Sequence, residues 1–230
     1  MSAVVVLAGG SPHAHDFAAT GAELADLASA LGHDVTMTSD PDTAAELLGD
    51  ADALVFDGLW WRMLGDTYDA WRDEHGYSPS PATRAALGGF VHAGGGLLAV
   101  HTAPISFDDW PEWGAVVGGA WQWGVSSHPP PQQATVSVAA AEHPVTRGVA
   151  PMFTITDEIY GDLAVDPEVV VLATSRRNPT DADQPVLWAH RYGAGRVVYD
   201  ALGHDRASLT HPDHQQLLEQ ALTWVTGGDR

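Results

Sequence analysis

The sequence predicts an α/β fold: a three-layer sandwich whose central sheet is mostly parallel, with antiparallel strands in the C-terminal half. Short apolar runs alternate with segments of helical periodicity through residues 1–100, as in repeated strand–helix–strand units. The second half carries strand patterns with no helix between them, and Tyr192-Gly-Ala-Gly195 marks a tight hairpin. Because the chain shows no repeat, linker or low-complexity tract, we expect a single domain over residues 1–230.

The N-terminal half is expected to form parallel units with right-handed crossovers. The expected strands cover residues 4–8, 35–38, 53–56 and 97–100, and the expected helices cover residues 17–31, 43–48 and 81–91. Gly32 is placed to cap the first helix, and Pro81 is placed to open the last one. Residues 59–80 form an insertion rich in Trp, Asp and Tyr.

The C-terminal half opens with an aromatic, glycine-rich segment, residues 110–123, and breaks at Pro129-Pro130-Pro131. Residues 135–138 alternate as an edge strand does, and further strands are expected at 169–174, 186–189 and 196–201. An apolar stripe from residue 212 to residue 224 predicts a final amphipathic helix. The hairpin between the last two strands makes this part of the sheet antiparallel.

The composition excludes several classes of partner and chemistry. The chain has no cysteine, which removes disulfides, thiolate metal sites and a cysteine nucleophile. With 30 acidic and 10 basic residues, the formal net charge of -20 repels nucleic acid and anionic membrane surfaces. The N-terminus lacks a basic leader, and no run approaches the roughly 20 apolar residues of a membrane span. We therefore expect a cytoplasmic protein.

Polar residues follow several of the expected strands. They are His13 and His15 after the first strand, Asp57 after the third, His101 after the fourth, and His204 and Asp205 after the last. Open α/β sheets bind ligands beyond the carboxyl ends of their strands. Each residue alone has a structural explanation, but their convergence at one edge predicts a site.

The segment Gly94-Gly-Gly-Leu-Leu-Ala-Val-His101 resembles a nucleophile elbow, in which a sharp turn after a buried strand exposes one side chain. The exposed group here is an imidazole, which near neutral pH suits proton transfer better than covalent catalysis. We therefore select His101 as a catalytic candidate. The alternative is that it only caps the edge of the sheet.

Two carboxylates stand side by side in Asp157-Glu158-Ile-Tyr160. Successive residues of an extended segment point to opposite sides, so only one carboxylate faces a given cleft. Tyr160 shares the side of Glu158, which makes Glu158 the expected acid–base group and leaves Asp157 to support the fold. His204 is expected to act on substrate while Asp205 orients a histidine or a sugar hydroxyl. A capped turn or solvated carboxylates are the alternative for both pairs.

Tryptophans concentrate in the two irregular segments, where their faces can stack on sugar rings or pack the loops. Trp60 and Trp121 are the preferred cleft candidates, with His128 at the rim. The two histidines after the first strand, together with His101 and His204, raise the alternative of a metal site. Tight ligand spacing, a P-loop and a GxGxxG motif are all missing from the sequence. No metal and no cofactor is therefore assigned.

Several motifs, in order along the chain, resemble those of ThuA-like proteins of trehalose utilisation. They are GGGLLAVH at 94–101, His143-Pro-Val145, Asp157-Glu-Ile-Tyr160, Pro185-Val-Leu-Trp188 with Tyr192-Gly-Ala-Gly-Arg196, and Gly203-His-Asp205. The resemblance covers nearly the whole chain. It implies a flavodoxin-like fold similar to that of class I glutamine amidotransferases, without their catalytic cysteine. It also implies a role in sugar metabolism near trehalose and related glycosides, often beside oxidoreductases that make 3-keto sugars.

We therefore expect an enzyme that acts on a keto-sugar or glycoside by elimination, hydrolysis or isomerisation, with His101, Glu158 and His204 as acid–base residues. The residues expected to bind the sugar are His13, His15, Asp57, Trp60, Trp121, His128, Asp157, Tyr160 and Asp205. Two alternatives stay open: a non-catalytic carbohydrate-binding protein on the same fold, and a metal-dependent hydrolase that uses His13, His15 and His101. The expected partners are a small-molecule sugar and a second copy in a homodimer.

Overall fold

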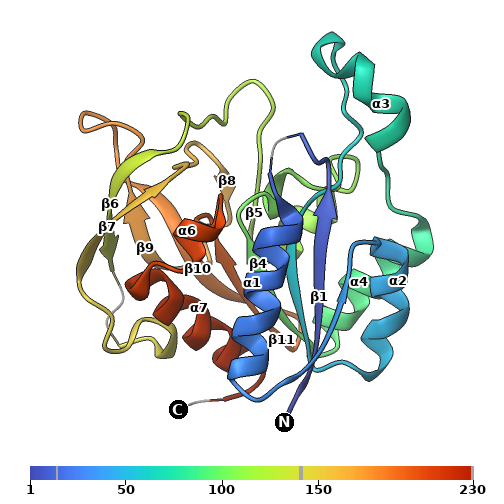
Figure 1. The fold of residues 1–230 in the computed structure, drawn as a ribbon, viewed down its shortest axis with the longest axis horizontal. Coiled ribbons are helices and arrows are strands. Elements are labelled where there is room, and N and C mark those ends of the chain that lie inside the picture. Colours follow the sequence, from blue (N-terminus) through green and yellow to red (C-terminus); the bar gives the residue numbers. More distant parts are fainter. Residues whose placement is uncertain (14, 140–141, 229–230) are drawn as a thin grey trace.

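The fold is built on one large mixed sheet (Figure 1). A computed structural model describes residues 1–13, 15–139 and 142–228. The strands of the main sheet are β1 (Ala3–Gly10), β2 (Asp34–Thr38), β3 (Ala53–Leu59), β4 (Gly96–Val100), β6 (Gln132–Val138), β7 (Met152–Asp157), β9 (Val170–Ser175), β10 (Gln184–Tyr192) and β11 (Gly195–Asp200). Within the described residues these nine strands lie in the order β2-β1-β3-β4-β11-β10-β9-β6-β7. Two short strands, β5 (Gly119–Ala120) and β8 (Ala164–Val165), pair separately.

The sheet changes character at β11. From β2 to β11 every neighbouring pair is parallel, whereas the pairs from β11 through β10, β9 and β6 to β7 are antiparallel. Alternation across the second part makes β7 run in the same direction as β11, β4 and β1. The carboxyl ends of these four strands therefore point to one edge of the molecule, where ligands bind in open α/β sheets.

Helices cover both faces of the sheet and complete three layers (Figure 1). They are α1 (Phe17–Ala30), α2 (Pro41–Leu47), α3 (Asp69–His75), α4 (Pro81–His92), α5 (Pro111–Val117), α6 (Arg206–Leu209) and α7 (Pro212–Val225). On one face α1 packs against β1, and α7 packs against β4 and β11. On the other face α2 packs against β1, and α4 and α5 pack against β11. The predicted α/β sandwich, parallel in its first half and antiparallel in its second, is confirmed.

The parallel strands are apolar because both of their faces are covered. All residues of β3 and β4 are buried, which explains the near-continuous apolar runs at 53–56 and 97–100. At the end of β1 the backbone of Gly10 has φ +106°, and an added Cβ would lie 2.3 Å from the Leu59 carbonyl oxygen. Only glycine fits this approach, which brings the chain after β1 toward the ligand edge.

The structure corrects several details of the sequence prediction. β6 is an interior strand between β9 and β7, so the edge assignment for residues 135–138 is wrong. Alternation of polar and apolar residues indicates that one face of a strand is exposed, but it does not indicate whether the strand lies at the edge or in the interior of the sheet. The edge strand at this end of the sheet is β7, which alternates in burial along its whole length and was not expected. The second helix begins at Pro41, where the Asp40 carboxylate caps it, and not at residue 43.

The length and apolar content of the helices determine whether any of them could cross a membrane. No helix in the described part of the chain has both the length and the hydropathy that a bilayer crossing requires.

Candidate active site

Four side chains from distant segments meet at the ligand edge. His15 follows β1, His101 follows β4, Glu158 follows β7 and His204 follows β11. One nitrogen or oxygen atom from each of the four lies within 4.8 Å of the others. The set consists of three imidazoles and one carboxylate, which suits both proton transfer and the binding of a divalent cation.

His101 is fixed rigidly at the end of β4. Its φ of +45° is left-handed, which is uncommon for a residue other than glycine and matches the sharp turn expected at the elbow. Its backbone N–H donates to Asp200 O at 2.7 Å, and Tyr199 donates from its hydroxyl to His101 O at 2.8 Å. The side chain is buried, with Nδ1 2.8 Å from Ala201 O. A proton on Nδ1 makes that bond and leaves Nε2 facing the site.

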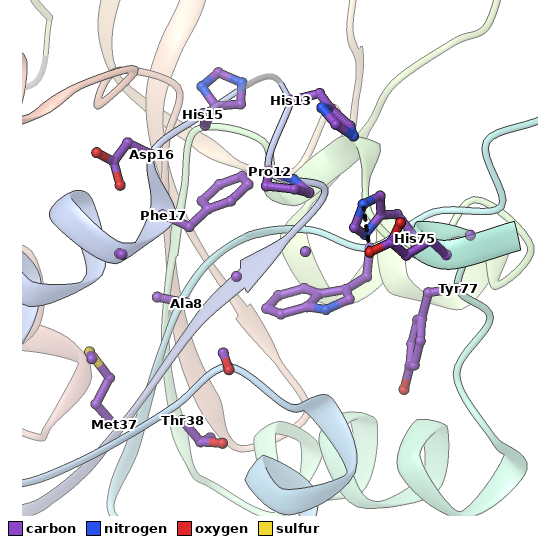
Figure 2. A pocket seen from close by; sticks show the side chains of 17 residues that line it. Ala8, Pro12, His13, His15, Asp16, Phe17, Met37, Thr38, His75 and Tyr77 are labelled. Carbon is purple, nitrogen blue, oxygen red and sulfur yellow. Dashed lines mark ion pairs between the residues drawn. The ribbon is translucent and has the colours of Figure 1, made fainter. Parts of the chain in front are cut away.

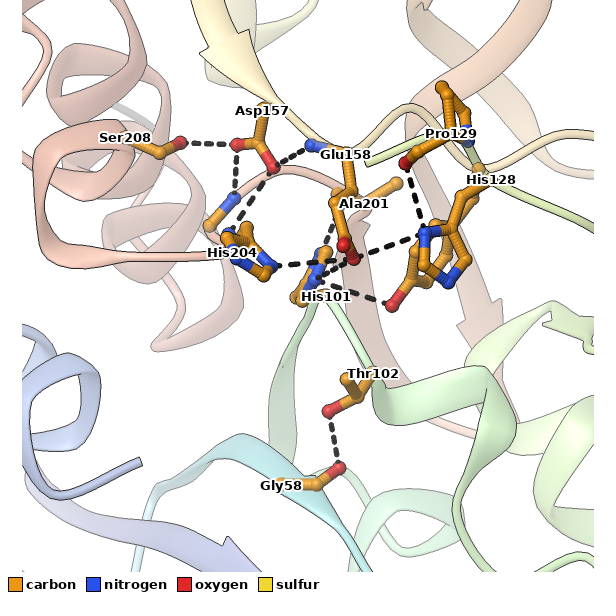
Figure 3. A network of polar contacts seen from close by, with 12 residues as sticks. Gly58, His101, Thr102, His128, Pro129, Asp157, Glu158, Ala201, His204 and Ser208 are labelled. Carbon is orange, nitrogen blue, oxygen red and sulfur yellow. Dashed lines mark hydrogen bonds and ion pairs between the residues drawn. The ribbon is translucent and has the colours of Figure 1, made fainter. Parts of the chain in front are cut away.

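The Glu158 carboxylate lies at the centre of the site (Figure 3). Its Oε2 atom is 3.3 Å from His128 Nδ1, 3.3 Å from His204 Nδ1 and 3.5 Å from His101 Nε2. Burial alone raises the pKa of a carboxyl group, but contact with these three histidines outweighs burial and holds the pKa of Glu158 far below its usual range. Glu158 is therefore an anion at every physiological pH.

The surrounding imidazoles differ in charge. Burial, followed by the proximity of His101 and His204, lowers the pKa of His15 to about 3, so His15 is neutral. Contact with Glu158 raises the pKa of both His128 and His204 above the usual histidine value. The site thus combines a neutral imidazole with imidazoles that hold protons more readily than usual.

Asp157 fixes the backbone of the segments that carry Glu158 and His204. Its carboxylate accepts hydrogen bonds from the backbone N–H of Glu158 at 2.7 Å and of Gly203 at 2.8 Å, and from the Ser208 hydroxyl (Figure 3). The fully buried side chain ties the chain after β7 to the chain after β11. Asp205 caps α6 by accepting from Ser208 N at 2.8 Å. Neither carboxylate borders the cavity described next.

An aromatic cavity of about 400 Å³ opens above Glu158, large enough for a small ligand. Its walls include four tryptophans, Trp61, Trp71, Trp121 and Trp123, and its polar border includes His13, His15, His128, Glu158 and Tyr160. The rings of Trp61 and Trp123 stack with centroids 4.9 Å apart, and Trp123 is 52% exposed. The Tyr160 hydroxyl lies 3.3 Å from His101 Nε2 on the floor.

A second, broader cavity of about 1230 Å³ lies beside the ends of β1 and β2 (Figure 2). His15 borders both cavities. His13 also borders both, but it packs against Trp71 and His75, with ring centroids 4.5 Å and 5.2 Å away. Trp60 borders the broad cavity and is otherwise packed against Phe56 in the core. Only the smaller cavity reaches Glu158, so we place the chemistry there.

The tryptophans that border the small cavity are only in part those that the sequence predicted. Trp121 borders the small cavity as expected, with its ring centroid 5.4 Å from that of Tyr160. Trp61 and Trp123 were not singled out, although both lie in the segments where tryptophans concentrate. Because adjacent residues after a strand point to opposite sides, Trp60 turns to the core and Trp61 turns to the cavity.

Asp57 lies behind the site and borders neither cavity. Its side chain is 1% exposed, and its Oδ2 atom accepts a hydrogen bond from the Thr20 hydroxyl at 2.6 Å. Burial raises the pKa of Asp57 to about 6, against the smaller opposing effects of Thr20 and His101.

This shift predicts a pH dependence of stability that Asp57→Asn removes. Between about pH 4 and pH 6 the folded protein keeps a proton that the unfolded chain releases, so the free energy of unfolding falls as pH rises. A shift of about two pKa units corresponds to about 3 kcal/mol. Urea denaturation should show wild type losing about that much relative to Asp57→Asn between pH 4 and pH 7. Asp50→Asn, at an exposed carboxyl, is the control; curves for wild type and Asp57→Asn that run parallel would contradict the prediction.

Comparisons with known proteins give a matching family model and solved structures that share the fold. The family model ThuA, described as trehalose utilisation, matches residues 3–225. No curated protein matches the sequence. A solved structure from Parabacteroides merdae ATCC 43184, described as ThuA-like, has a TM-score of 0.80 at 17% identity and covers 98% of this chain and 90% of that chain. A second, from Bacteroides uniformis ATCC 8492, has a TM-score of 0.71 at 21% identity and covers 97% and 90%.

A β-galactosidase from Bacillus circulans sp. alkalophilus shares the fold more distantly. Its TM-score is 0.56 at 13% identity, and the match covers 98% of this chain but 30% of that chain. At these identities the solved structures show a common fold alone.

Proposed function

Because the chain belongs to the ThuA family of trehalose utilisation, we propose that it is an enzyme that acts on a keto-sugar or a glycoside at the cluster around Glu158. Family membership supports a role in sugar metabolism in general. The substrate class and the reaction are inferred from the chemistry of the site.

The observation that carries the proposal is the convergence of titratable groups at the floor of an aromatic cavity. Sugar rings present apolar C–H faces that stack on indole rings, and Trp121 and Trp123 supply such faces. Hydroxyl groups of the same sugar need hydrogen-bond partners, and His128, Glu158 and Tyr160 supply them on the floor. A cavity with both features fits a carbohydrate better than an apolar or a highly charged ligand.

The residues at the floor match the requirements of proton abstraction beside a ketone. A base removes the proton from the carbon next to the carbonyl, the C–H electron pair forms a carbon–carbon double bond, and the carbonyl electron pair moves to oxygen. Burial raises the pKa of Tyr160 well above its usual value, so its hydroxyl keeps a proton and can stabilise that oxyanion. Return of the proton to the former carbonyl carbon, with transfer of the hydroxyl proton of the deprotonated carbon to the former carbonyl oxygen, moves the ketone by one carbon. This is an isomerisation, and no oxidant is needed.

A glycosidic oxygen one carbon further along changes the outcome to elimination. Its bond to carbon breaks, the leaving oxygen takes a proton from an imidazole, and the sugar keeps a double bond conjugated to the carbonyl. Addition of water to that double bond completes a hydrolysis. We assign the proton transfers among His101, Glu158 and His204: Glu158, ionised in the resting site, can serve only as a base, and an imidazole supplies the proton to the leaving oxygen.

The test is NMR of the purified protein in D2O with 3-keto-trehalose and 3-keto-glucosides, with trehalose as the ketone-free control. We expect deuterium to enter the carbon beside the ketone and product to form, and both should disappear in His101→Ala. His92→Ala, at an exposed position on α4, should behave as wild type. Saturable binding with neither exchange nor product would replace the proposal with the carbohydrate-binding alternative.

A further inference from the structure

We propose that His15, His101, Glu158 and His204 form a binding site for a divalent transition-metal ion. The site deepens the proposed function, because an ion at this position would act on the sugar in the same cavity. With the ion bound, His101, Glu158 and His204 would serve as its ligands, and the proton transfers assigned to them would fall to lining groups outside the donor set, His128 and Tyr160. Its catalytic consequence rests on the proposed function, whereas the binding of the ion does not.

The distances within the cluster fit a single ion. Zinc is bound by histidine nitrogens and carboxylate oxygens at about 2.0–2.2 Å, so neighbouring ligands of a tetrahedral site lie roughly 3.4 Å apart. Glu158 Oε2 is 3.3 Å from His204 Nδ1 and 3.5 Å from His101 Nε2. His15 completes the set within the overall limit of 4.8 Å. His101 and Glu158 are buried, whereas His15 and His204 are only partly buried, so the adjustment that draws the four donors onto one ion falls on the last two.

Unpartnered polar atoms point to the same place. His15 Nδ1, Glu158 Oε2 and His204 Nδ1 are buried, and none of them has a hydrogen-bond partner. The Glu158 side chain is itself 9% exposed. Leaving a buried polar atom unsatisfied costs about 1–3 kcal/mol, and more for a charged group. A cation at the centre of the cluster would satisfy all three atoms, whereas the present contacts of Glu158 Oε2 are ion pairs of 3.3–3.5 Å with His101, His128 and His204.

The orientation of His101 favours a ligand role. Its Nδ1 lies 2.8 Å from Ala201 O, and donation to that carbonyl fixes the tautomer with the lone pair of Nε2 directed into the cluster (Figure 3). Histidines that bind metals commonly donate their other N–H to a backbone carbonyl in this way. Asp157 supports the segments that carry Glu158 and His204, because its carboxylate accepts hydrogen bonds from the backbone N–H groups of Glu158 and Gly203.

The donor types select the class of ion. Three imidazoles and one carboxylate suit zinc and the neighbouring first-row divalent metals, whereas magnesium and calcium prefer all-oxygen sites. The cavity side of the cluster faces Trp121 and Trp123, so a sugar oxygen can approach there as a further ligand. A bound ion would polarise the ketone of a keto-sugar as a Lewis acid. His13, expected from its sequence position beside His15, is outside the donor set.

The experiment uses protein without a histidine tag, stripped with a chelator and titrated with Zn²⁺ and, as a spectroscopic probe, with Co²⁺. Elemental analysis and the visible Co²⁺ absorption should show about one ion per chain. Glu158→Gln, which preserves side-chain shape, and His204→Ala should each weaken binding by at least about 100-fold. His13→Ala and His92→Ala should bind as wild type, and circular dichroism checks that each variant is folded.

The outcomes separate this inference from the proposed function. Absence of stoichiometric binding, or binding that survives in both Glu158→Gln and His204→Ala, would overturn the metal site. Full turnover of a keto-sugar by metal-free protein would overturn its catalytic role and leave the proposed function standing. Stoichiometric binding without turnover of any keto-sugar would support the site and overturn the proposed function.

Discussion

Glu158→Gln is expected to lower the turnover of a 3-keto-glycoside by about 10²- to 10⁴-fold, the range that a positioned acid–base group contributes. The substitution keeps the shape of the side chain and removes its charge. Three histidines then lose the anion that holds them within 3.5 Å of one carboxylate oxygen. The effect should fall mainly on kcat, because the aromatic walls are unchanged and a glutamine can still hydrogen-bond a sugar hydroxyl.

The matched control for this prediction is Glu46→Gln, which makes the same chemical change at an exposed position on α2. Initial rates with one keto-glycoside at several concentrations separate kcat from KM. If Glu158→Gln retained full turnover, the assignment of the reaction to this cluster would be wrong.

His214→Ala is expected to lower the free energy of unfolding by about 3–5 kcal/mol, the usual cost of leaving a buried charge without its partner. The side chain of His214 is fully buried on α7, with Nε2 2.9 Å from Asp200 Oδ2 and Nδ1 2.9 Å from Ser208 O. Burial acts to lower the pKa of His214, but Asp200 and Ser208 outweigh it and raise the pKa above the usual histidine value. The imidazolium thus donates from both nitrogens.

The pH dependence of this loss has a definite sign. A raised histidine pKa contributes stability fully below the unfolded value of about 6.5, and the contribution disappears as pH rises through the folded value. Denaturant unfolding should therefore show a smaller difference between wild type and His214→Ala above that pKa. His92→Ala should stay within about 0.5 kcal/mol of wild type. A double variant, Asp200→Leu/His214→Leu, should cost less than the sum of its single changes, and strict additivity would contradict a coupled pair.

Apart from α3, which lies in the segment expected to be an irregular insertion, the strands and helices of the parallel half were predictable because their signals are local. An apolar run such as residues 97–100 reports burial on both faces, and Pro81 after Ser80 marks a helix start. That Glu158 and Tyr160 lie on the same side of their segment was predictable for the same reason. Alternation along an extended segment placed them on one side, and both lie next to His101.

Other features depend on contacts between distant segments and have no local signal. His13 and His15 are two residues apart, yet only His15 joins the donor set, whereas the His13 ring packs against Trp71. Periodicity likewise could not show that β7 is an edge strand or that Glu158 lies against the histidines that follow β4 and β11. The sequence raised a metal site as an alternative, but it could not show that Glu158 joins the donor set and that His13 does not, because the four donors span residues 15–204.

The position of β11 beside β4 has a consequence for how the protein is made. Leu97 pairs with Val197, so β4 is synthesised one hundred residues before its neighbour. At 5–20 residues per second this interval lasts about 5–20 s. During that time the apolar β4 exposes an unpaired edge, which is the kind of surface that recruits other nascent strands. Biosynthesis of this protein is therefore expected to depend on chaperones that shield the first half until the second half emerges.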